Sequence, residues 1–202
     1  KSHIFLSHSH QDEELAITLA GWLHDNFGLV SFIDSCVWGY SNDLLRLIDD
    51  RFCLNPSGET YSYEKRNFST SHVHMMLNTA LMTKIDDSEC VIFLNSPNSI
   101  STSRVISQTE SPWIYSELSM TQVLRKKTPQ RRILREKRYF SKGEVVNESL
   151  KIKYDVNLNH LNSIDADSLN NWIEEVTTKD SEKALDVFYR QNPIKDMQLI
   201  GG

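Results

Sequence analysis

Short apolar runs alternate with amphipathic segments along most of the chain. Three runs, residues 3–7, 29–34 and 89–96, are apolar and rich in strand-favouring residues, which predicts three buried strands. Elsewhere apolar residues recur every three or four positions, which is typical of helices with one buried face. This pattern predicts helices over residues 9–28, 41–52, 72–84 and 113–125.

Weaker patterns describe the remaining segments. Polar residues mixed with turn formers predict two long loops, over residues 55–71 and 96–111. Ser9 and Asp12 form a capping-box pattern at the start of the first helix, and Gly28 marks its end. The C-terminal third is expected to add two strands and then two helices, over residues 131–136, 150–158, 167–176 and 181–189.

The alternation of apolar strands with amphipathic helices indicates an α/β fold, a parallel sheet covered by helices on both faces. Such sheets bind ligands just outside the carboxyl ends of their strands. Three polar loops follow the predicted strands at that edge: SHSHQ (7–11), DSCVWGYSN (34–42) and NSPNS (95–99). We therefore expect a functional site where these loops meet.

Composition narrows the class of protein. The 202 residues are 39% hydrophobic and 24% charged, which is ordinary for one globular domain. A net charge of −5 predicts no general attraction to nucleic acid, and no apolar run approaches the ~20 residues of a membrane-spanning helix. Cys36, Cys53 and Cys90 are an odd number without CxxC spacing, which favours reduced thiols in a cytoplasmic protein.

Two polar features each have a functional and a plain interpretation. His8 and His10 alternate as metal ligands do, but no third ligand is evident in the sequence, so a polar loop without a metal is favoured. The basic run at residues 125–138 could bind nucleic acid or a phosphate, but a solvated charged loop is favoured.

One helix carries a carboxylate within its apolar stripe. Ser111 and Pro112 are suited to the N-cap and the first helical position. Trp113, Met120 and Leu124 then fall on one stripe at helical spacing, and Glu117 lies on the same stripe. The apolar stripe of a helix often contains a polar residue, so the alternative is that Glu117 is an ordinary solvated residue of the helix. Because this helix follows the third strand, we expect Glu117 to face a crevice at the sheet edge.

Three segments together resemble a TIR (Toll/interleukin-1 receptor) domain. They are IFLSHSHQDEELA (4–16), FIDSCVWG (32–39), which resembles the strand and glycine-containing BB loop of the family, and ECVIFLNSPNS followed by SPWIYSEL (111–118). The resemblance covers about residues 3–127. It implies a flavodoxin-like open parallel sheet, as one domain over residues 1–202. An inserted helix and loop (about 41–71), the long serine-rich loop and an elaborated C-terminal third resemble bacterial antiphage TIR proteins of Thoeris systems more than receptor TIR domains.

The resemblance also implies an activity. Many TIR domains are hydrolases that cleave NAD at the nicotinamide glycosidic bond, and the catalytic glutamate of the family corresponds to Glu117. Trp38 and Tyr40 are expected to stack on nicotinamide or adenine, and helix and loop amides near Ser9 to bind the diphosphate. The candidate pocket residues besides Glu117 are Ser7, His8, Asp34, Trp38, Gly39, Tyr40, Asn95, Ser96 and Trp113.

The expected partners follow from the same resemblance. NAD is the substrate, so no separate cofactor is expected. Copies of the chain are expected to associate through TIR contacts, and a separate effector protein to sense an ADP-ribose-derived second messenger in antiviral defence. Neither a membrane nor nucleic acid is an expected partner. Two alternatives stay open: a non-enzymatic TIR adaptor, and a nucleoside deoxyribosyltransferase that exchanges bases without using NAD.

Overall fold

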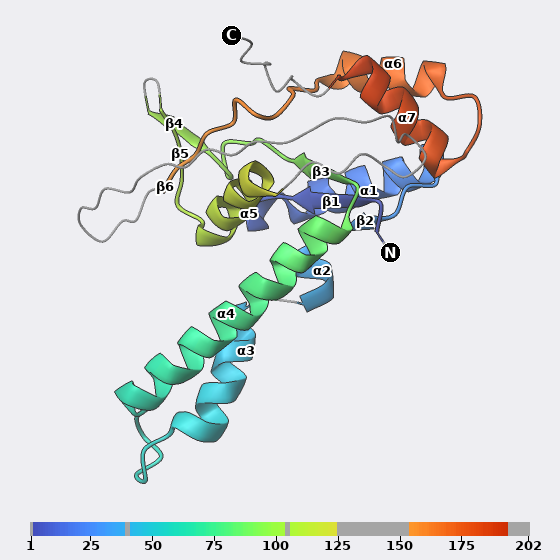
Figure 1. Ribbon diagram of the computed structural model, residues 1–202. Coiled ribbons are helices and arrows are strands. Elements are labelled where there is room, and N and C mark those ends of the chain that lie inside the picture. Colours follow the sequence, from blue (N-terminus) through green and yellow to red (C-terminus); the bar gives the residue numbers. More distant parts are fainter. Residues whose placement is uncertain (1, 39–40, 104–105, 125–153, 194–202) are drawn as a thin grey trace.

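A three-stranded parallel sheet lies at the centre of the fold. The computed structural model describes residues 2–38, 41–103, 106–124 and 154–193. Strand β1 (Ile4–Ser7) lies between β2 (Ser31–Phe32) and β3 (Cys90–Phe93) in the order β2-β1-β3 (Figure 1). Both pairings are parallel. The structure confirms a mixed α/β fold and all three of these strands, and the observed β2 and β3 are shorter than the runs that predicted them.

Helices cover both faces of this sheet. Ile4 and Leu6 of β1 pack into one apolar cluster with α1 (Glu13–Phe27), α6 (Ala166–Glu175) and α7 (Ser181–Gln191). Phe5 points to the opposite face, where it packs with residues of α4 (Tyr63–Asp87) and α5 (Pro112–Val123). Because side chains alternate along a strand, Ser7 shares the face of Phe5, toward α4 and α5.

The first cluster is organised around one tryptophan. Trp172 of α6 is fully buried and stacks on Phe27 of α1 with ring centroids 4.0 Å apart. Its indole N–H donates to the carbonyl oxygen of Ala184 in α7 over 2.9 Å. This hydrogen bond satisfies the buried donor and ties the two C-terminal helices together. The two helices predicted in this region are therefore confirmed.

The first helix ends as predicted but begins differently. Gly28 has φ 70°, and its backbone N–H donates to the carbonyl oxygen of His24, so the glycine closes α1 as a C-cap. The helix is preceded by a short 3₁₀ turn, η1 (His10–Asp12), and neither Ser9 nor Asp12 caps it with its side chain. The capping-box prediction is wrong because the Asp12 carboxylate accepts hydrogen bonds from Ser96 and Asn98 instead.

A helical hairpin projects from the body of the molecule (Figure 1). After α2 (Asp34–Trp38), the chain forms α3 (Ser41–Ile48) and a π-helical turn, η2 (Asp49–Cys53), and it returns along the 25-residue helix α4. The predicted loop at 55–71 is wrong from residue 63 onward, where α4 begins after its N-cap Ser62. This part of α4 is mostly exposed, with few buried positions, so its hydrophobic pattern is weak.

The serine-rich segment also contains structure that its composition does not indicate. Strands β4 (Ser101–Ser103), β5 (Ile106–Thr109) and β6 (Tyr154–Asp155) form a small antiparallel sheet. The loop prediction for 96–111 is therefore wrong in part, and the strand prediction at 150–158 is confirmed at β6. The predicted strand at 131–136 and the basic run at 125–138 lie outside the described residues. In the described part of the chain, no helix is both long and apolar enough to cross a membrane.

Candidate functional site

A small cavity opens beside the carboxyl ends of β1 and β2. Its volume is about 270 Å³. His8 follows β1, Asp34 lies two residues after β2, and α5 supplies Trp113 and Glu117. The complete lining is His8, His10, Asp34, Ser35, Ser41, Asn42, Leu44, Leu77, Leu81, Ser111, Trp113 and Glu117. The three chain segments therefore meet where parallel α/β sheets usually bind ligands.

Helix α5 brings Glu117 to this cavity. The Ser111 hydroxyl accepts a hydrogen bond from the backbone N–H of Ile114, and Pro112 occupies the first turn, as predicted. Trp113, Met120 and Leu124 pack on the apolar cluster that contains Phe5, Phe32 and Leu81. Glu117 belongs to the same stripe and is only 4% exposed. Its carboxyl group is thus held at the cavity by the packing of the side chains around it.

Ser7 is the hydrogen-bond partner of this glutamate. Its hydroxyl donates to Oε2 of Glu117, and the Ser7 residue is 1% exposed. The contact follows from the alternation along β1, which turns Ser7 toward α5. A hydroxyl donor stabilises the ionised carboxylate, so Ser7 supports the charged form of Glu117.

The surroundings of Glu117 nevertheless favour its neutral form. Burial raises the pKa of Glu117 to about 8, and the nearby negative charge of Asp34 adds to the rise, whereas the Ser7 hydrogen bond opposes it. At neutral pH the group therefore holds its proton unless a positive charge lies beside it. A buried carboxyl with such a pKa is a frequent mark of a functional site.

His8 is tied to the loop that follows β2. Its Nδ1 lies 3.9 Å from Oδ1 of Asp34, and its Nε2 lies 3.3 Å from the Ser35 hydroxyl. Both ring nitrogens thus face partners within the protein. Among the described residues, no group of three His, Cys, Asp or Glu side chains is arranged to hold a metal ion.

The wall formed by α5 is fixed against α4. The Trp113 ring stacks on His74 with centroids 5.4 Å apart and an interplanar angle of 25°. One turn further along α5, the Ser116 hydroxyl donates to the side-chain oxygen of Asn78 over 2.6 Å. These contacts join two helices on the same side of the sheet, so the aromatic wall beside Glu117 is held in place.

The structure brings together part of the predicted residue set. Ser7, His8, Asp34, Trp113 and Glu117 meet around the cavity. Ser96 and Asn95 do not line it: Ser96 donates to Asp12, and Asn95 is exposed.

Three of the predicted residues belong to the loop after β2. Trp38 is the last residue of α2, but its side chain lies outside what the structure describes, as do Gly39 and Tyr40.

Several lining residues were not predicted as site residues. Ser35, Ser41 and Asn42 belong to the segment between β2 and α3, whose position after a parallel strand was the available signal. Leu77 and Leu81 lie one turn apart on α4, and in sequence they are indistinguishable from ordinary core positions.

The cavity is suited to a flat cation. Two acidic side chains, Asp34 and Glu117, share it with the indole ring of Trp113. The Asp34 carboxylate attracts positive charge, a bound cation favours the ionised form of Glu117, and an aromatic face adds to the attraction. The Asp34 carboxylate repels phosphate and other anions.

Comparisons with protein families, with curated proteins and with solved structures give no match to this chain.

Proposed function

We propose that this chain is a TIR-like enzyme that cleaves NAD at the nicotinamide glycosidic bond, with Glu117 as the catalytic carboxylate. The observation that carries the proposal is the buried Glu117 carboxyl in a cavity at the carboxyl edge of the parallel sheet. The order β2-β1-β3 puts β1 in the centre of the sheet, and the cavity lies just beyond the carboxyl ends of β1 and β2, at the edge where such sheets bind ligands. The three TIR-like sequence segments supply the substrate class.

The chemistry needs one well-placed carboxylate. When the bond between C1 of the ribose and the nicotinamide nitrogen breaks, its electron pair moves to the nitrogen and neutralises the pyridinium charge. The ribose then carries oxocarbenium character, as in other glycosidic cleavages. A carboxylate at Glu117 stabilises that positive charge as it develops, and the low polarity of a buried site strengthens the effect. No general acid is required because the leaving group departs as neutral nicotinamide.

The cavity accommodates one end of the dinucleotide. Its volume of about 270 Å³ is just below the ~300–1,000 Å³ of typical small-molecule sites. The acidic side chains select the cationic nicotinamide riboside end over the diphosphate. The pyridinium charge in turn lowers the pKa of Glu117, so the substrate itself promotes formation of the carboxylate that the reaction uses.

The expected product is an ADP-ribose-derived signal. The cation at C1 can be captured by water, by another atom of the same nucleotide or by a bound nucleophile, depending on how the pocket positions the acceptor. A signal that a separate effector protein senses fits the resemblance to Thoeris TIR proteins and a role in antiphage defence. A TIR adaptor has no need for a buried carboxyl, whose burial costs stability at neutral pH.

The direct test is to incubate the purified chain with NAD, with and without a crowding agent, and to separate the products by chromatography with mass detection. We expect nicotinamide release that increases with crowding, and a nucleotide product other than linear ADP-ribose. Parallel incubation with pairs of deoxynucleosides and free bases tests the base-exchange alternative. The proposal is overturned if NAD stays intact in the purified protein and in extracts of infected cells that contain it.

The pH dependence of cleavage should reveal the buried carboxyl. We expect kcat/KM for NAD to rise about tenfold per pH unit from pH 6 and to level near pH 8, because the free enzyme must lose the Glu117 proton. Initial rates are measured against enzyme-free blanks at each pH. In Ser7→Ala the rising limb should move to higher pH, because the hydroxyl that stabilises the carboxylate is gone. A flat profile between pH 6 and 8 would contradict this assignment.

A further inference from the structure

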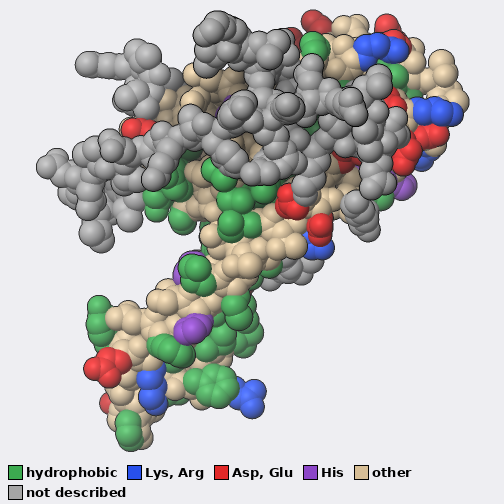
Figure 2. Space-filling model, viewed as in Figure 1, with side chains coloured by type: hydrophobic (Ala, Val, Ile, Leu, Met, Phe, Trp, Pro, Cys, Tyr) green, Lys and Arg blue, Asp and Glu red, His purple; other side chains and the backbone are tan. Residues whose placement is uncertain are grey.

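The projecting hairpin carries an apolar groove that the proposed function does not use. The groove has a volume of about 520 Å³, lies between α3–η2 and α4, and shares no lining residue with the cavity at Glu117. Three of its large side chains are mostly exposed: Phe52 by 62%, Phe68 by 69% and Met76 by 60%. Figure 2 shows hydrophobic side chains gathered on this hairpin, away from the body of the protein. Exposed apolar surface of this kind commonly marks an interaction site.

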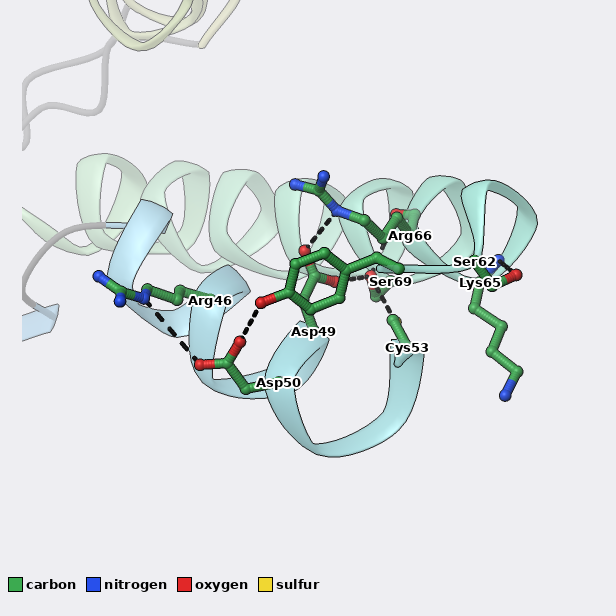
Figure 3. Close-up of polar contacts among 9 residues, drawn as sticks. Arg46, Asp49, Asp50, Cys53, Ser62, Lys65, Arg66 and Ser69 are labelled. Carbon is green, nitrogen blue, oxygen red and sulfur yellow. Dashed lines mark hydrogen bonds and ion pairs between the residues drawn. The ribbon is translucent and has the colours of Figure 1, made fainter. Parts of the chain in front are cut away.

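A buried polar network holds the hairpin in shape. Asp49 of η2 is 3% exposed, and its carboxylate accepts hydrogen bonds from Arg66 over 2.8 Å and from Ser69 over 2.9 Å (Figure 3). Burial raises the pKa of Asp49, but these hydrogen bonds outweigh it and leave the pKa below its ordinary value. The Cys53 thiol also contacts the Ser69 hydroxyl. The turn is therefore tied to α4, and the apolar side chains are presented on a preformed surface.

After its first turn, which carries Glu64, Lys65 and Arg66, α4 lacks the charges that usually cover a solvated helix. Residues 67–83 contain no Asp, Glu, Lys or Arg, although these four residue types are among the most commonly exposed in folded proteins. A helix that lies on a membrane surface carries Lys and Arg along its polar face, so this stretch does not fit that role. A protein surface of similar, uncharged character is the matching partner.

The groove stripe on α4 is symmetric about its centre. Phe68, His72 and Met76 are spaced four residues apart, so they lie on one face of the helix. If two copies of α4 pack antiparallel with His72 at the centre, Phe68 of each copy lies opposite Met76 of the other. Aromatic rings and methionine sulfur form favourable contacts. The stripe is thus complementary to itself under a two-fold rotation.

We infer that the hairpin groove is an interface between two copies of this chain, which pair through antiparallel α4 helices about a two-fold axis at His72. Two hairpins joined in this way form a four-helix arrangement with a shared apolar core. Leu47, one residue before the groove-lining Ile48, is 70% exposed, and Met75 is 65% exposed. Together with the three groove side chains they offer on the order of 600 Å² of apolar surface per copy, close to the ~800 Å² per partner that stable interfaces bury. This pairing is independent of NAD cleavage.

The oligomeric state of the full chain tests the inference. Sedimentation velocity should show a dimer at micromolar concentration. Phe68→Glu and Met76→Glu should each raise the dissociation constant at least 100-fold, because each places a charge within the apolar contact. Tyr63→Glu is the matched control: Tyr63 lies on the same helix, is 79% exposed and does not line the groove. It should leave the dimer intact, and circular dichroism should be unchanged in all three variants.

A cross-linking experiment tests the orientation. In a Cys36→Ser background, which removes the exposed native thiol, His72→Cys should form a covalent dimer under mild oxidation because the two copies meet at this residue. Ser71→Cys, which is exposed and lies about 100° around the helix from His72, should cross-link much less. A wild-type chain that stays monomeric at 100 µM overturns the inference, as does a dimer that survives Phe68→Glu. A dimer without the His72→Cys cross-link also overturns it.

Discussion

Replacing Glu117 by glutamine is expected to lower the rate of NAD cleavage by about 10²–10³-fold, the usual effect of losing one electrostatic contact to a transition state. Glutamine has nearly the same shape and can still accept the hydrogen bond that Ser7 donates. It cannot carry the negative charge that opposes the ribosyl cation. The substitution should therefore slow the chemical step, so that kcat and kcat/KM are lowered together.

Single-turnover assays with excess enzyme and labelled NAD measure this effect without interference from product release. Glu174→Gln is the matched control, because Glu174 is exposed on α6, far along the chain from the cavity residues. It makes the same chemical change and should leave the rate within twofold of wild type. An active Glu117→Gln enzyme would remove the central role assigned to this carboxyl group.

The parallel sheet and its covering helices could be predicted from the sequence because their signals are strong and local. Buried parallel strands are continuous apolar runs, and residues 3–7 and 89–96 show this clearly. Helix α5 has an N-cap serine, a proline in its first turn and a regular stripe, so the sequence predicts both where the helix starts and which face is buried. The position of Glu117 on that stripe could be predicted for the same reason.

Features that depend on distant partners could not be predicted. The pattern of Ser9 and Asp12 indicates a capping box, but Asp12 binds Ser96 and Asn98, which lie more than eighty residues away. A side chain with a capping pattern does not cap its helix when the fold offers it stronger hydrogen-bond partners. The start of α4 could not be predicted because the segment from residue 63 to residue 71 is mostly exposed and polar, so it has no regular apolar stripe.

The residues of the candidate site likewise include some that the sequence could predict and some that it could not. Ser7 and Asp34 could be predicted as members because they lie at or just after the ends of neighbouring parallel strands. Leu77 and Leu81 could not be predicted, since a helical apolar pair has the same pattern whether it faces a core or a cavity. The pKa of Glu117 depends on burial and on the distance to Asp34, and neither quantity is encoded in residue spacing.

The stability of the fold should fall as the pH rises from about 4.5 to about 8, and Glu117 should account for a large share of that fall. The pKa of Glu117 is about 8 in the folded chain against an ordinary value of 4.5. Between these values the folded state holds a proton that the unfolded state releases, so rising pH favours unfolding. Below pH 4.5 both states are protonated, and above pH 8 both are ionised. The difference between these two pKa values corresponds to on the order of 5 kcal/mol of unfolding free energy.

Urea unfolding of wild type and Glu117→Gln at pH 5, 6, 7 and 8 isolates this contribution, because every other titrating group is common to both proteins. We expect the stability of Glu117→Gln relative to wild type to increase steadily from pH 5 to pH 8, since glutamine has no proton to lose. A difference that stays constant with pH would show that Glu117 titrates normally. A substitution that slows cleavage about 10²–10³-fold while stabilising the fold is the result expected when a residue is retained for chemistry, because replacing a purely structural residue at this position would destabilise the protein.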